Sequence, residues 1–298
     1  MSRIAYVNGR YLPLGRATVH IEDRGYQFAD GVYEVCLIRN GHFVDEALHM
    51  ARLSRSLGEL KIRWPVIPNA LAVIAREIVL RNGIRDGLLY IQITRGVAPR
   101  NHPFPSGNVT PTLVLMARST DLAAGDRQAE EGVAVVTRPD IRWQRVDIKT
   151  VSLLPNVLAK QSAKEEGAVE AWLVDRDGFI TEGSSTNAWI VSSDGVLMTR
   201  KASDGILRGV TRTVVFEMLD GSDIRFEERR FTVDEALAAR EAFLTSAGNL
   251  VMPVISIDRK PIGGGKPGPI ATELRRLFLD HAKASALRYT PQATNMSD

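Results

Sequence analysis

Four Asn-Gly or Asp-Gly pairs, each between two short apolar segments, limit the possible folds of this chain more than any other feature of its sequence. Asn8-Gly9 separates IAYV from RYLPL, and Asn40-Gly41 separates VCLIR from HFVDE. Asp177-Gly178 and Asp194-Gly195 stand in the same way within AWLVDRDGFITEG and AWIVSSDGVLMTR. Such pairs tolerate the positive φ angles that tight antiparallel hairpins require. The sequence therefore predicts two-residue turns at all four places and sheets that are largely antiparallel.

Segments with helical spacing lie between these strands. DEALHMARLSRSLGEL carries apolar residues that should share one helix face, namely Leu48, Ala51, Leu53 and Leu57. NALAVIAREIVLRNG, NVLAKQSAKEEG, RGVTRTVVFEMLD and ATELRRLFLDHAKASAL predict further helices, and Thr232 with Glu235 predicts a capping box. LLYIQITRG, TLVLMAR, VAVVTR and AFLTS predict additional strands. The mixture indicates the α+β class.

The stretch STDLAAGDRQAEEG, residues 119–132, is polar and rich in small side chains, which is typical of a linker. We therefore expect two domains, a small N-terminal one at residues 1–118 and a larger one at residues 133–298. The polar residues behind the last helix are expected to be disordered.

Composition and the missing signals exclude several classes of protein. Of the 298 residues 44% are hydrophobic and 24% are charged, and the formal net charge is only +3, so the chain is expected to be soluble and globular. The sequence has no basic block with interleaved aromatic residues, so a nucleic-acid partner is not expected. The sequence shows no secretory signal, so export is not expected. It has no apolar run of roughly 20 residues, so a membrane span is not expected either. We therefore expect a cytoplasmic protein.

Cysteine and histidine usage argues against a disulfide or a metal site. Cys36 is the only cysteine, which excludes an internal disulfide. Four histidines are scattered without the spacing of metal ligands and are expected to be ordinary surface or cap residues; they are His20, His42, His49 and His281.

Lys149 is the first candidate for chemistry. It lies in RVDIKTVSLL, where Val146, Ile148 and Val151 alternate with polar residues and predict a strand. Most lysines in such a strand are simply solvated. A lysine that points into a cavity can instead form an imine with a carbonyl cofactor, because a desolvated amine stays nucleophilic.

Two further segments could hold a polar cofactor. The run Thr181–Asn187 could be an ordinary hydroxyl-rich loop, or it could place the Glu182 carboxylate against a ring nitrogen. The run Leu207–Arg212 begins a predicted helix, where free N–H groups bind phosphate and where Gly209 allows close backbone approach. Many helices begin in this way and bind nothing.

The loop that follows LLYIQITRG could recognise a substrate. Arg100 and His102 stand two residues apart between Pro99 and Pro103, and together could grip one carboxylate. The same charges could equally be incidental on an exposed loop. Gly263–Gly265 lacks the strand and helix of a dinucleotide-binding motif, so a Rossmann site is not expected.

Taken together and in order, these segments resemble one family. The run EDRGYQFADGVYE (residues 22–34) and the features above resemble the fold-type IV, or class IV, pyridoxal-phosphate aminotransferases, and within them the enzymes specific for D-amino acids. The resemblance extends from about residue 4 to residue 280. It implies pyridoxal 5′-phosphate as the cofactor and a two-domain α+β fold with a large C-terminal domain of mostly antiparallel sheet.

The resemblance also implies roles for individual residues. Lys149 matches the lysine that forms the internal aldimine and later moves the proton. Glu182 matches the partner of the pyridine nitrogen, and Arg52 matches the arginine that clamps the phosphate. The remaining positions expected to contact the cofactor are Ser184, Ser185, Leu207, Gly209, Val210, Thr211, Ser246 and Ala247. Ala247 departs from the family pattern, because the D-specific enzymes often carry a hydroxyl there.

For the substrate carboxylate the resemblance implies Tyr33, Arg100 and His102, with the last two reaching across a homodimer interface from the partner subunit. The implied function is ping-pong transfer of an amino group from a D-amino acid such as D-alanine to 2-oxoglutarate or pyruvate. The rivals are a branched-chain L-aminotransferase, an (R)-amine transaminase, a lyase of the aminodeoxychorismate type and a non-catalytic binding protein.

Overall fold

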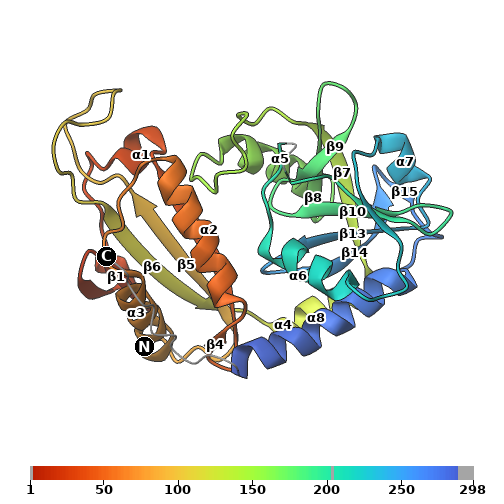
Figure 1. Ribbon diagram of the computed structural model, residues 1–298, viewed down its shortest axis with the longest axis horizontal. Helices are drawn as coiled ribbons and strands as arrows, with labels where there is room; N and C mark the ends of the chain where they lie inside the picture. Colours follow the sequence, from red (N-terminus) through yellow and green to blue (C-terminus); the bar gives the residue numbers. More distant parts are fainter. Residues whose placement is uncertain (1–2, 203–204, 288–298) are drawn as a thin grey trace.

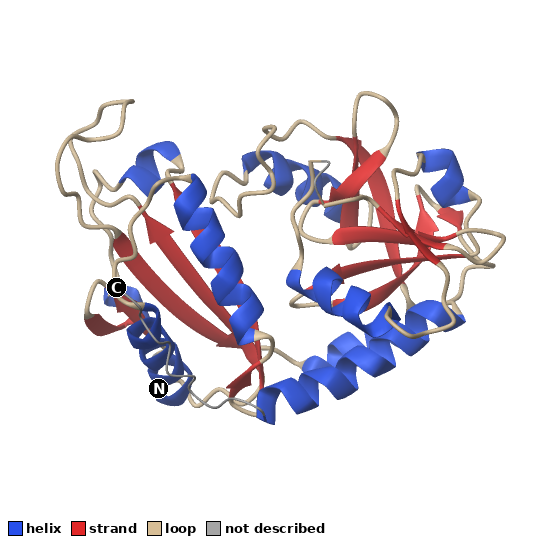
Figure 2. Cartoon of the chain, viewed as in Figure 1, coloured by secondary structure: helices blue, strands red, loops and turns tan. Residues whose placement is uncertain are grey.

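Two β-sheets, each with its own helices, make up the computed structural model, which describes residues 3–202 and 205–287. Figure 1 shows the sheets beside each other, with the last helix, α8 (Pro269–Leu287), running below both. Figure 2 shows helices and strands mixed in both halves. The predicted α+β class is confirmed.

The first sheet has six strands in the order β2-β1-β6-β5-β3-β4, and every neighbouring pair is antiparallel. Its strands are β1 (Ile4–Val7), β2 (Arg10–Pro13), β3 (Gly31–Arg39), β4 (His42–Phe43), β5 (Gly87–Thr94) and β6 (Thr112–Ser119). The short helices η1 (Leu14–Arg16) and α1 (Arg24–Phe28) lie between β2 and β3 in the chain.

Buried side chains alternate along these strands and show which face of the first sheet is covered by helices. Val32, Cys36 and Ile38 of β3 share a buried cluster with apolar residues of α2 (Glu46–Glu59) and α3 (Pro68–Arg81). Successive side chains of a strand point to opposite faces. The opposite face therefore carries Tyr33 and Val35, and it is this face that borders the large cavity described below.

The second sheet has nine strands, in the order β12-β11-β10-β13-β14-β7-β8-β9 with β15 paired to β14. Its strands are β7 (Val133–Pro139), β8 (Glu170–Val174), β9 (Ile180–Gly183), β10 (Asn187–Val191), β11 (Leu197–Thr199), β12 (Phe226–Glu228), β13 (Glu241–Ser246), β14 (Leu250–Ile257) and β15 (Lys260–Pro261). Most pairs are antiparallel, as predicted, but β7 is parallel to both β14 and β8, and β11 is parallel to β12.

Helices connect or cover the parallel parts of this sheet. α5 (Leu154–Glu165) links β7 to β8 and packs on both. α6 (Val210–Leu219) and α8 bury Val214 and Phe278 in a third cluster, which also takes in Leu37 of β3 and Val44, the residue after β4. The predicted capping box opens α7 (Val233–Leu237), where Glu235 N donates to Thr232 Oγ1 at 3.1 Å.

The four predicted turns divide into two kinds. Asn8-Gly9 and Asn40-Gly41 have positive φ at both residues, so these two-residue hairpin turns are confirmed. The prediction is wrong for the two Asp-Gly pairs, since five residues separate β8 from β9 and β10 from β11. In each loop only the glycine has a positive φ, and Gly178 N donates to Asp175 O at 3.1 Å. A turn followed by one left-handed residue closes these hairpins instead.

The segment expected to be a linker, residues 119–132, is largely helical. α4 (Leu122–Glu131) begins at Asp121, whose carboxylate accepts a hydrogen bond from Ala124 N. It stands between the last strand of the first sheet and the first strand of the second, and the domain limits stay a prediction. Ala51 is exposed rather than on the buried face of α2. The predicted disordered tail lies outside the described residues, and among those described no helix could span a bilayer.

Candidate active site

A cavity of about 320 Å³ lies between the two sheets. Pockets of this size hold small-molecule ligands. The predicted cofactor residues all contribute to its lining, namely Arg52, Lys149, Glu182, Ser184, Ser185, Leu207, Gly209, Val210, Thr211, Ser246 and Ala247. Tyr33 lines it as well, whereas Arg100 and His102 do not. The structure thus brings together residues that are distributed over most of the chain.

Lys149 lies in a loop, so the predicted strand at this position is wrong. Of the residues around Lys149, only Thr150 pairs with a strand, through a single bridge to Val32 near the start of β3. Tyr33 N donates to Lys149 O at 3.0 Å, and buried Ile148 anchors the loop in the first core cluster. Ile148 is thus anchored in a core cluster, whereas Val146 lines the cavity together with Lys149.

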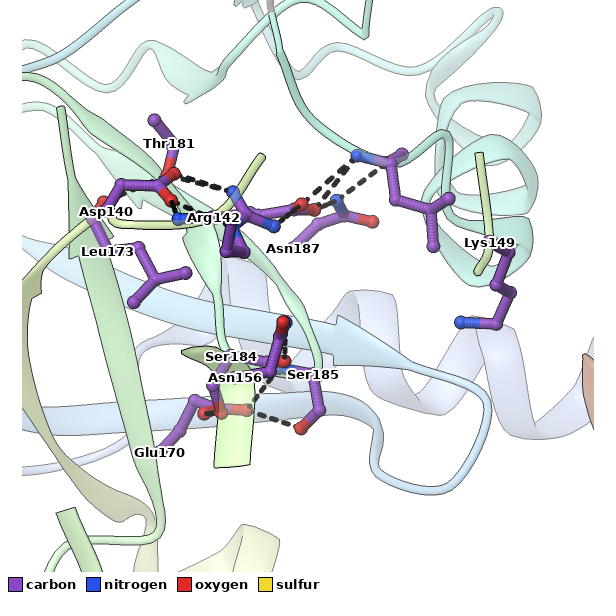
Figure 3. Close-up of polar contacts among 12 residues, drawn as sticks. Asp140, Arg142, Lys149, Asn156, Glu170, Leu173, Thr181, Ser184, Ser185 and Asn187 are labelled. Carbon is purple, nitrogen blue, oxygen red and sulfur yellow. Dashed lines mark hydrogen bonds and ion pairs between the residues drawn. The ribbon is translucent and has the colours of Figure 1, made fainter. Parts of the chain in front are cut away.

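The Lys149 amine lies within the cavity. Its Nζ atom is 3.3 Å from Tyr33 Oη and 4.3 Å from the centre of the Tyr33 ring. In Figure 3 the side chain extends toward the polar groups around β9 and β10. The amine and the Glu182 carboxylate thus share one cavity, as the imine hypothesis requires.

Glu182 is almost fully buried at the end of β9, and three partners hold its carboxylate. Arg142 Nη1 donates to Oε1 at 2.5 Å, Asn187 Nδ2 donates to Oε2 at 2.9 Å, and Leu207 N lies 3.2 Å from both oxygens. Burial raises the pKa of Glu182 above its ordinary value, while the charge of Arg142 opposes that rise. The site therefore holds a carboxylate with an increased affinity for a proton.

Arg142 was not foreseen from the sequence. Its guanidinium also bonds Asp140, with Nη2 2.7 Å from Oδ2 (Figure 3). Asp140 and Glu182 together therefore surround it. Arg142 lies 40 residues from Glu182, and nothing in their local patterns joins them. The only sequence feature that could have indicated Arg142 is that it stands two residues after Asp140, shortly before Lys149.

Arg52 reaches the cavity from α2 and is fixed by Glu34 of β3. Its Nε and Nη2 atoms donate to the two oxygens of Glu34 at 2.8 Å each, and Nη1 donates to Arg208 O at 3.1 Å. A guanidinium has five N–H donors. Two of them therefore remain for a ligand, one on Nη1 and one on Nη2.

His49 completes this cluster, so the expectation that it is an ordinary surface or cap residue is wrong. Its side chain is 3% exposed, and Nδ1 lies 2.9 Å from Glu34 Oε2. Burial alone would raise the pKa of Glu34, but Arg52 and His49 lower it to about 2. Glu34 thus stays charged and holds Arg52 in place.

The beginning of α6 offers further donors. Gly209 is its N-cap and has no side chain to bond the first N–H groups, and buried Thr211 adds a hydroxyl at the cavity wall. A Cβ atom at Gly209 would stand 2.1 Å from Asn187 Oδ1, so the position demands glycine. Opposite, Ser246 Oγ accepts from Asn249 N at 3.1 Å, and Ala247 can offer only its backbone. This wall is built for an anion such as phosphate.

Ser184 and Ser185 line the cavity, but their hydroxyls bind a buried carboxylate beneath it (Figure 3). Ser184 Oγ and Ser185 Oγ donate to Glu170, the second at 2.7 Å, and Lys160 Nζ is 3.2 Å from the same carboxylate. Asn156 Nδ2 donates to Ser184 O at 2.7 Å. Within this chain the two serines position the loop, and a direct cofactor contact stays a prediction.

Arg100 and His102 lie on the surface of the loop between β5 and β6, at the upper left of Figure 1 and away from the cavity. Arg24 fixes this loop by donating to Asn101 O at 2.6 Å and His102 O at 3.2 Å. Phe28 of α1 packs against the His102 ring, with centroids 5.4 Å apart. A single chain therefore cannot bring this pair to its own Lys149.

Known families and proteins resemble this chain over most of its length. Residues 31–257 match the family model described as Amino-transferase class IV. A D-alanine aminotransferase of Bacillus licheniformis is 41% identical over 268 residues, 90% of this chain and 93% of that protein. One from Staphylococcus aureus (strain N315) is 39% identical over 282 residues, 95% of this chain and 99% of that protein.

Solved structures show the same overall arrangement. The branched-chain amino acid aminotransferase of Escherichia coli has a TM-score of 0.86 at 20% identity, covering 96% of each chain, which is evidence of the fold alone. The branched-chain aminotransferase of the archaeon Thermoproteus uzoniensis, solved with norvaline, has a TM-score of 0.84 at 25% identity and covers 98% of each chain.

Proposed function

Because the chain belongs to the class IV aminotransferases, we propose that it transfers the amino group of D-amino acids such as D-alanine to a 2-oxo acid, 2-oxoglutarate or pyruvate. Pyridoxal 5′-phosphate is the cofactor of this family. The predicted fold-type IV architecture is confirmed. The single observation that carries the proposal is the cavity shared by the Lys149 amine, the Glu182 carboxylate and the anion-binding wall.

The residues present fit this cofactor. Lys149 would hold its aldehyde carbon, and Glu182 would face its ring nitrogen. The two remaining N–H groups of Arg52, the start of α6 and the Ser246–Ala247 backbone would hold its phosphate. When bound, the cofactor supplies an electron sink that makes the hydrogen on the substrate α-carbon acidic.

Lys149 acts as the acid and base of the reaction. Its amine would remove the proton from the α-carbon of the substrate and pass it to the aldehyde carbon of a bound cofactor, so the amine must be free of a permanent carboxylate partner. Only the Tyr33 hydroxyl bonds the amine among the described residues, at 3.3 Å. No carboxylate among the described residues bonds the amine.

Glu182 keeps the site electron-withdrawing. Its carboxylate, whose pKa is raised by burial, would hold a proton on the ring nitrogen of a bound cofactor, and the charge of Arg142 opposes the rise in that pKa. Asn187 and Leu207 N fix its orientation. The ion pair between Arg142 and Glu182 thus sets both the position of the Glu182 carboxylate and its affinity for a proton.

The substrate carboxylate decides the stereochemistry. We assign it to Tyr33 together with Arg100 and His102 of the partner subunit, because an arginine fork and an imidazole bind one carboxylate firmly. With the carboxylate held there, the α-hydrogen would face Lys149 in only one of the two enantiomers of an amino acid. The curated relatives named above are D-alanine enzymes, which supports the D assignment.

A homodimer is part of the proposal. Large apolar side chains are exposed on α1 and α5, including Tyr26 at 76% exposure and Leu154 at 69%. Val157 and Leu158 of α5 are also more than half exposed. Such surfaces favour burial against another chain. A cytoplasmic location stays a prediction from the sequence.

Turnover of three donors by the purified holoenzyme tests the assignment. D-alanine with 2-oxoglutarate should be converted, with L-leucine and a simple chiral (R)-amine much slower. Preference for L-leucine or for the amine would identify one of the rivals of the same fold. Release of pyruvate from aminodeoxychorismate in the absence of a 2-oxo acid would identify a lyase. If none of these substrates is converted, the chain would be a binding protein.

A further inference from the structure

One arginine of the cavity has no partner among the described residues. Arg52 and Arg142 are each committed to a carboxylate, Glu34 and Glu182. The guanidinium of Arg118, which also lines the cavity, makes no hydrogen bond or ion pair with any residue in the described part of the chain. Its charge is therefore available to a ligand that enters the cavity.

The strand register of the first sheet places Arg118 away from the end of the cavity where Lys149 lies. On the sheet face that borders the cavity, Arg118 of β6 lies opposite Leu88 of β5, and Leu88 lies opposite Leu37 of β3. Tyr33, whose hydroxyl contacts the Lys149 amine, stands four residues before Leu37 on β3, about 13 Å along the strand. The long side chain of Arg118 thus reaches the cavity from the end opposite Tyr33.

The wall between these two points is apolar. Val35 and Leu88 line the cavity there, and Leu88 lies against Gly248, with 3.7 Å between its Cδ1 atom and an ideal Cβ at that glycine. A ligand that follows this wall from Lys149 meets aliphatic carbon first and a guanidinium last. This order matches a short methylene chain that ends in an anion.

We propose that Arg118 binds the distal carboxylate of dicarboxylic substrates, so that the enzyme accepts D-glutamate and 2-oxoglutarate in preference to donors and acceptors of similar length with apolar ends. The proposal rests on the proposed transamination and adds the residue that sets side-chain specificity. Tyr33 and Lys149 act on the amino acid end of the substrate, Val35 and Leu88 cover its methylenes, and Arg118 binds its far end.

Steady-state kinetics of Arg118 variants of the holoenzyme test this assignment. Arg118→Met keeps the aliphatic stem but removes the charge. It should lower kcat/KM for D-glutamate and for 2-oxoglutarate about tenfold or more, mainly through KM, as expected for loss of a charge-assisted hydrogen bond. Turnover of D-alanine with 2-oxobutyrate, an acceptor without a distal carboxylate, should stay within about twofold of the wild type. Arg118→Glu should reverse the preference, so that D-lysine is converted faster than D-glutamate.

The matched control is Arg10→Met, which removes an exposed arginine from β2 of the same sheet, outside the cavity lining. It should leave both substrate pairs unchanged. Equal losses on D-alanine and D-glutamate in Arg118→Met, a weakened affinity for the cofactor, or a wild-type enzyme that converts D-alanine but not D-glutamate would each overturn the role of Arg118. A wild-type enzyme that converts no D-amino acid would instead overturn the proposed function itself.

Discussion

Two buried carboxylates, Glu34 and Glu182, set the charge of the cavity wall in opposite ways. Glu34 has its pKa lowered to about 2 by Arg52 and His49, against the effect of burial. Glu182 has its pKa raised by burial, with Arg142 in opposition. One carboxylate thus serves as a fixed charge that holds an arginine, and the other as a group that can share a proton.

The first prediction concerns acid stability. Glu34 has a folded-state pKa below its ordinary 4.5, so its contribution to stability is complete above about pH 4.5 and is lost as the pH falls toward 2. The free energy of unfolding of Glu34→Gln should be lower by about 3–5 kcal/mol at pH 7, because Arg52 is left without its buried partner. Urea unfolding at a series of pH values measures this. A variant with the same stability and the same acid dependence as the wild type would contradict it.

The second prediction concerns Glu182. Glu182→Gln keeps the size of the side chain and the contact to Leu207 N but removes the charge that holds a proton on the ring nitrogen. The kcat for D-alanine should fall about 10²-fold or more, because the electron sink is weakened while binding is kept. Rapid-mixing kinetics with a measured cofactor content give the result. A rate close to that of the wild type with full cofactor content would exclude the proposed role.

Single residues were predictable from the sequence where a local motif carried them. Lys149 and Glu182 lie in short runs that stand out in the sequence, Arg52 follows only from the family resemblance, and the structure places all three in one cavity. Arg142 and His49 were missed because their partners are 40 and 15 residues away and become neighbours only after the chain folds. Ion-pair partners distant in sequence leave no periodic signal.

At the scale of elements, the start of α6 links the phosphate wall to Glu182. Asn187 Nδ2 bonds both Glu182 Oε2 and Leu207 O, and the bare backbone of Gly209 packs against the Asn187 amide. The N-terminus of one helix and the carboxylate at the end of a strand are thereby held in a fixed relation. A displacement of either element should disturb both ends of a bound cofactor.

The third prediction tests this link. In Gly209→Ala the new Cβ would stand 2.1 Å from Asn187 Oδ1, so Asn187 or the start of α6 must shift. The dissociation constant of pyridoxal phosphate should rise about tenfold or more, as for loss of one charge-assisted hydrogen bond. Equilibrium dialysis of the apoprotein measures it. Gly58→Ala in α2, where nothing lies within 4 Å, is the control and should leave the affinity unchanged. Equal affinities in all three proteins would show that the contact is unimportant.

The elements themselves were largely predictable, because strand and helix periods and turn residues are local signals. The Asn-Gly turns followed from their positive φ angles, whereas the Asp-Gly pairs closed loops of five residues because only the glycine adopts the left-handed conformation. The strand predicted at Lys149 was wrong because the apolar residues around it do not share one buried face: Ile148 lies in a core cluster, whereas Val146 lines the cavity. The α1 helix was missed, since its five residues make little more than one turn and cannot show a repeating apolar pattern.

At the scale of the whole molecule, the cavity exists because two sheets face each other. Leu37 and Val44 of the first half and Phe278 of α8 belong to one buried cluster, which fixes the halves against each other. No local pattern in the sequence specifies this packing. The family resemblance alone allowed it to be expected, together with a second subunit that supplies Arg100 and His102.

The fourth prediction tests that second subunit. Lys149→Ala and Arg100→Ala should each be nearly inactive toward D-alanine. Unfolding and refolding them together should restore activity, because a mixed dimer has one site with an intact Lys149 and an intact Arg100 of the partner subunit. Each variant refolded alone is the control. Activity that stays at the level of the separate variants, with mixed dimers demonstrated by mass spectrometry, would show that both residues act within one chain or that Arg100 has no role.

The identity of the lysine that carries the cofactor is the most direct test of the account. The holoenzyme is reduced with borohydride, digested, and the modified peptide is sequenced by mass spectrometry. We predict the phosphopyridoxyl group on Lys149 and its disappearance in Lys149→Ala, with Lys160→Ala as a control that keeps it. Stable modification at Lys160 or at another lysine, or none in a protein that still converts D-alanine, would contradict the account.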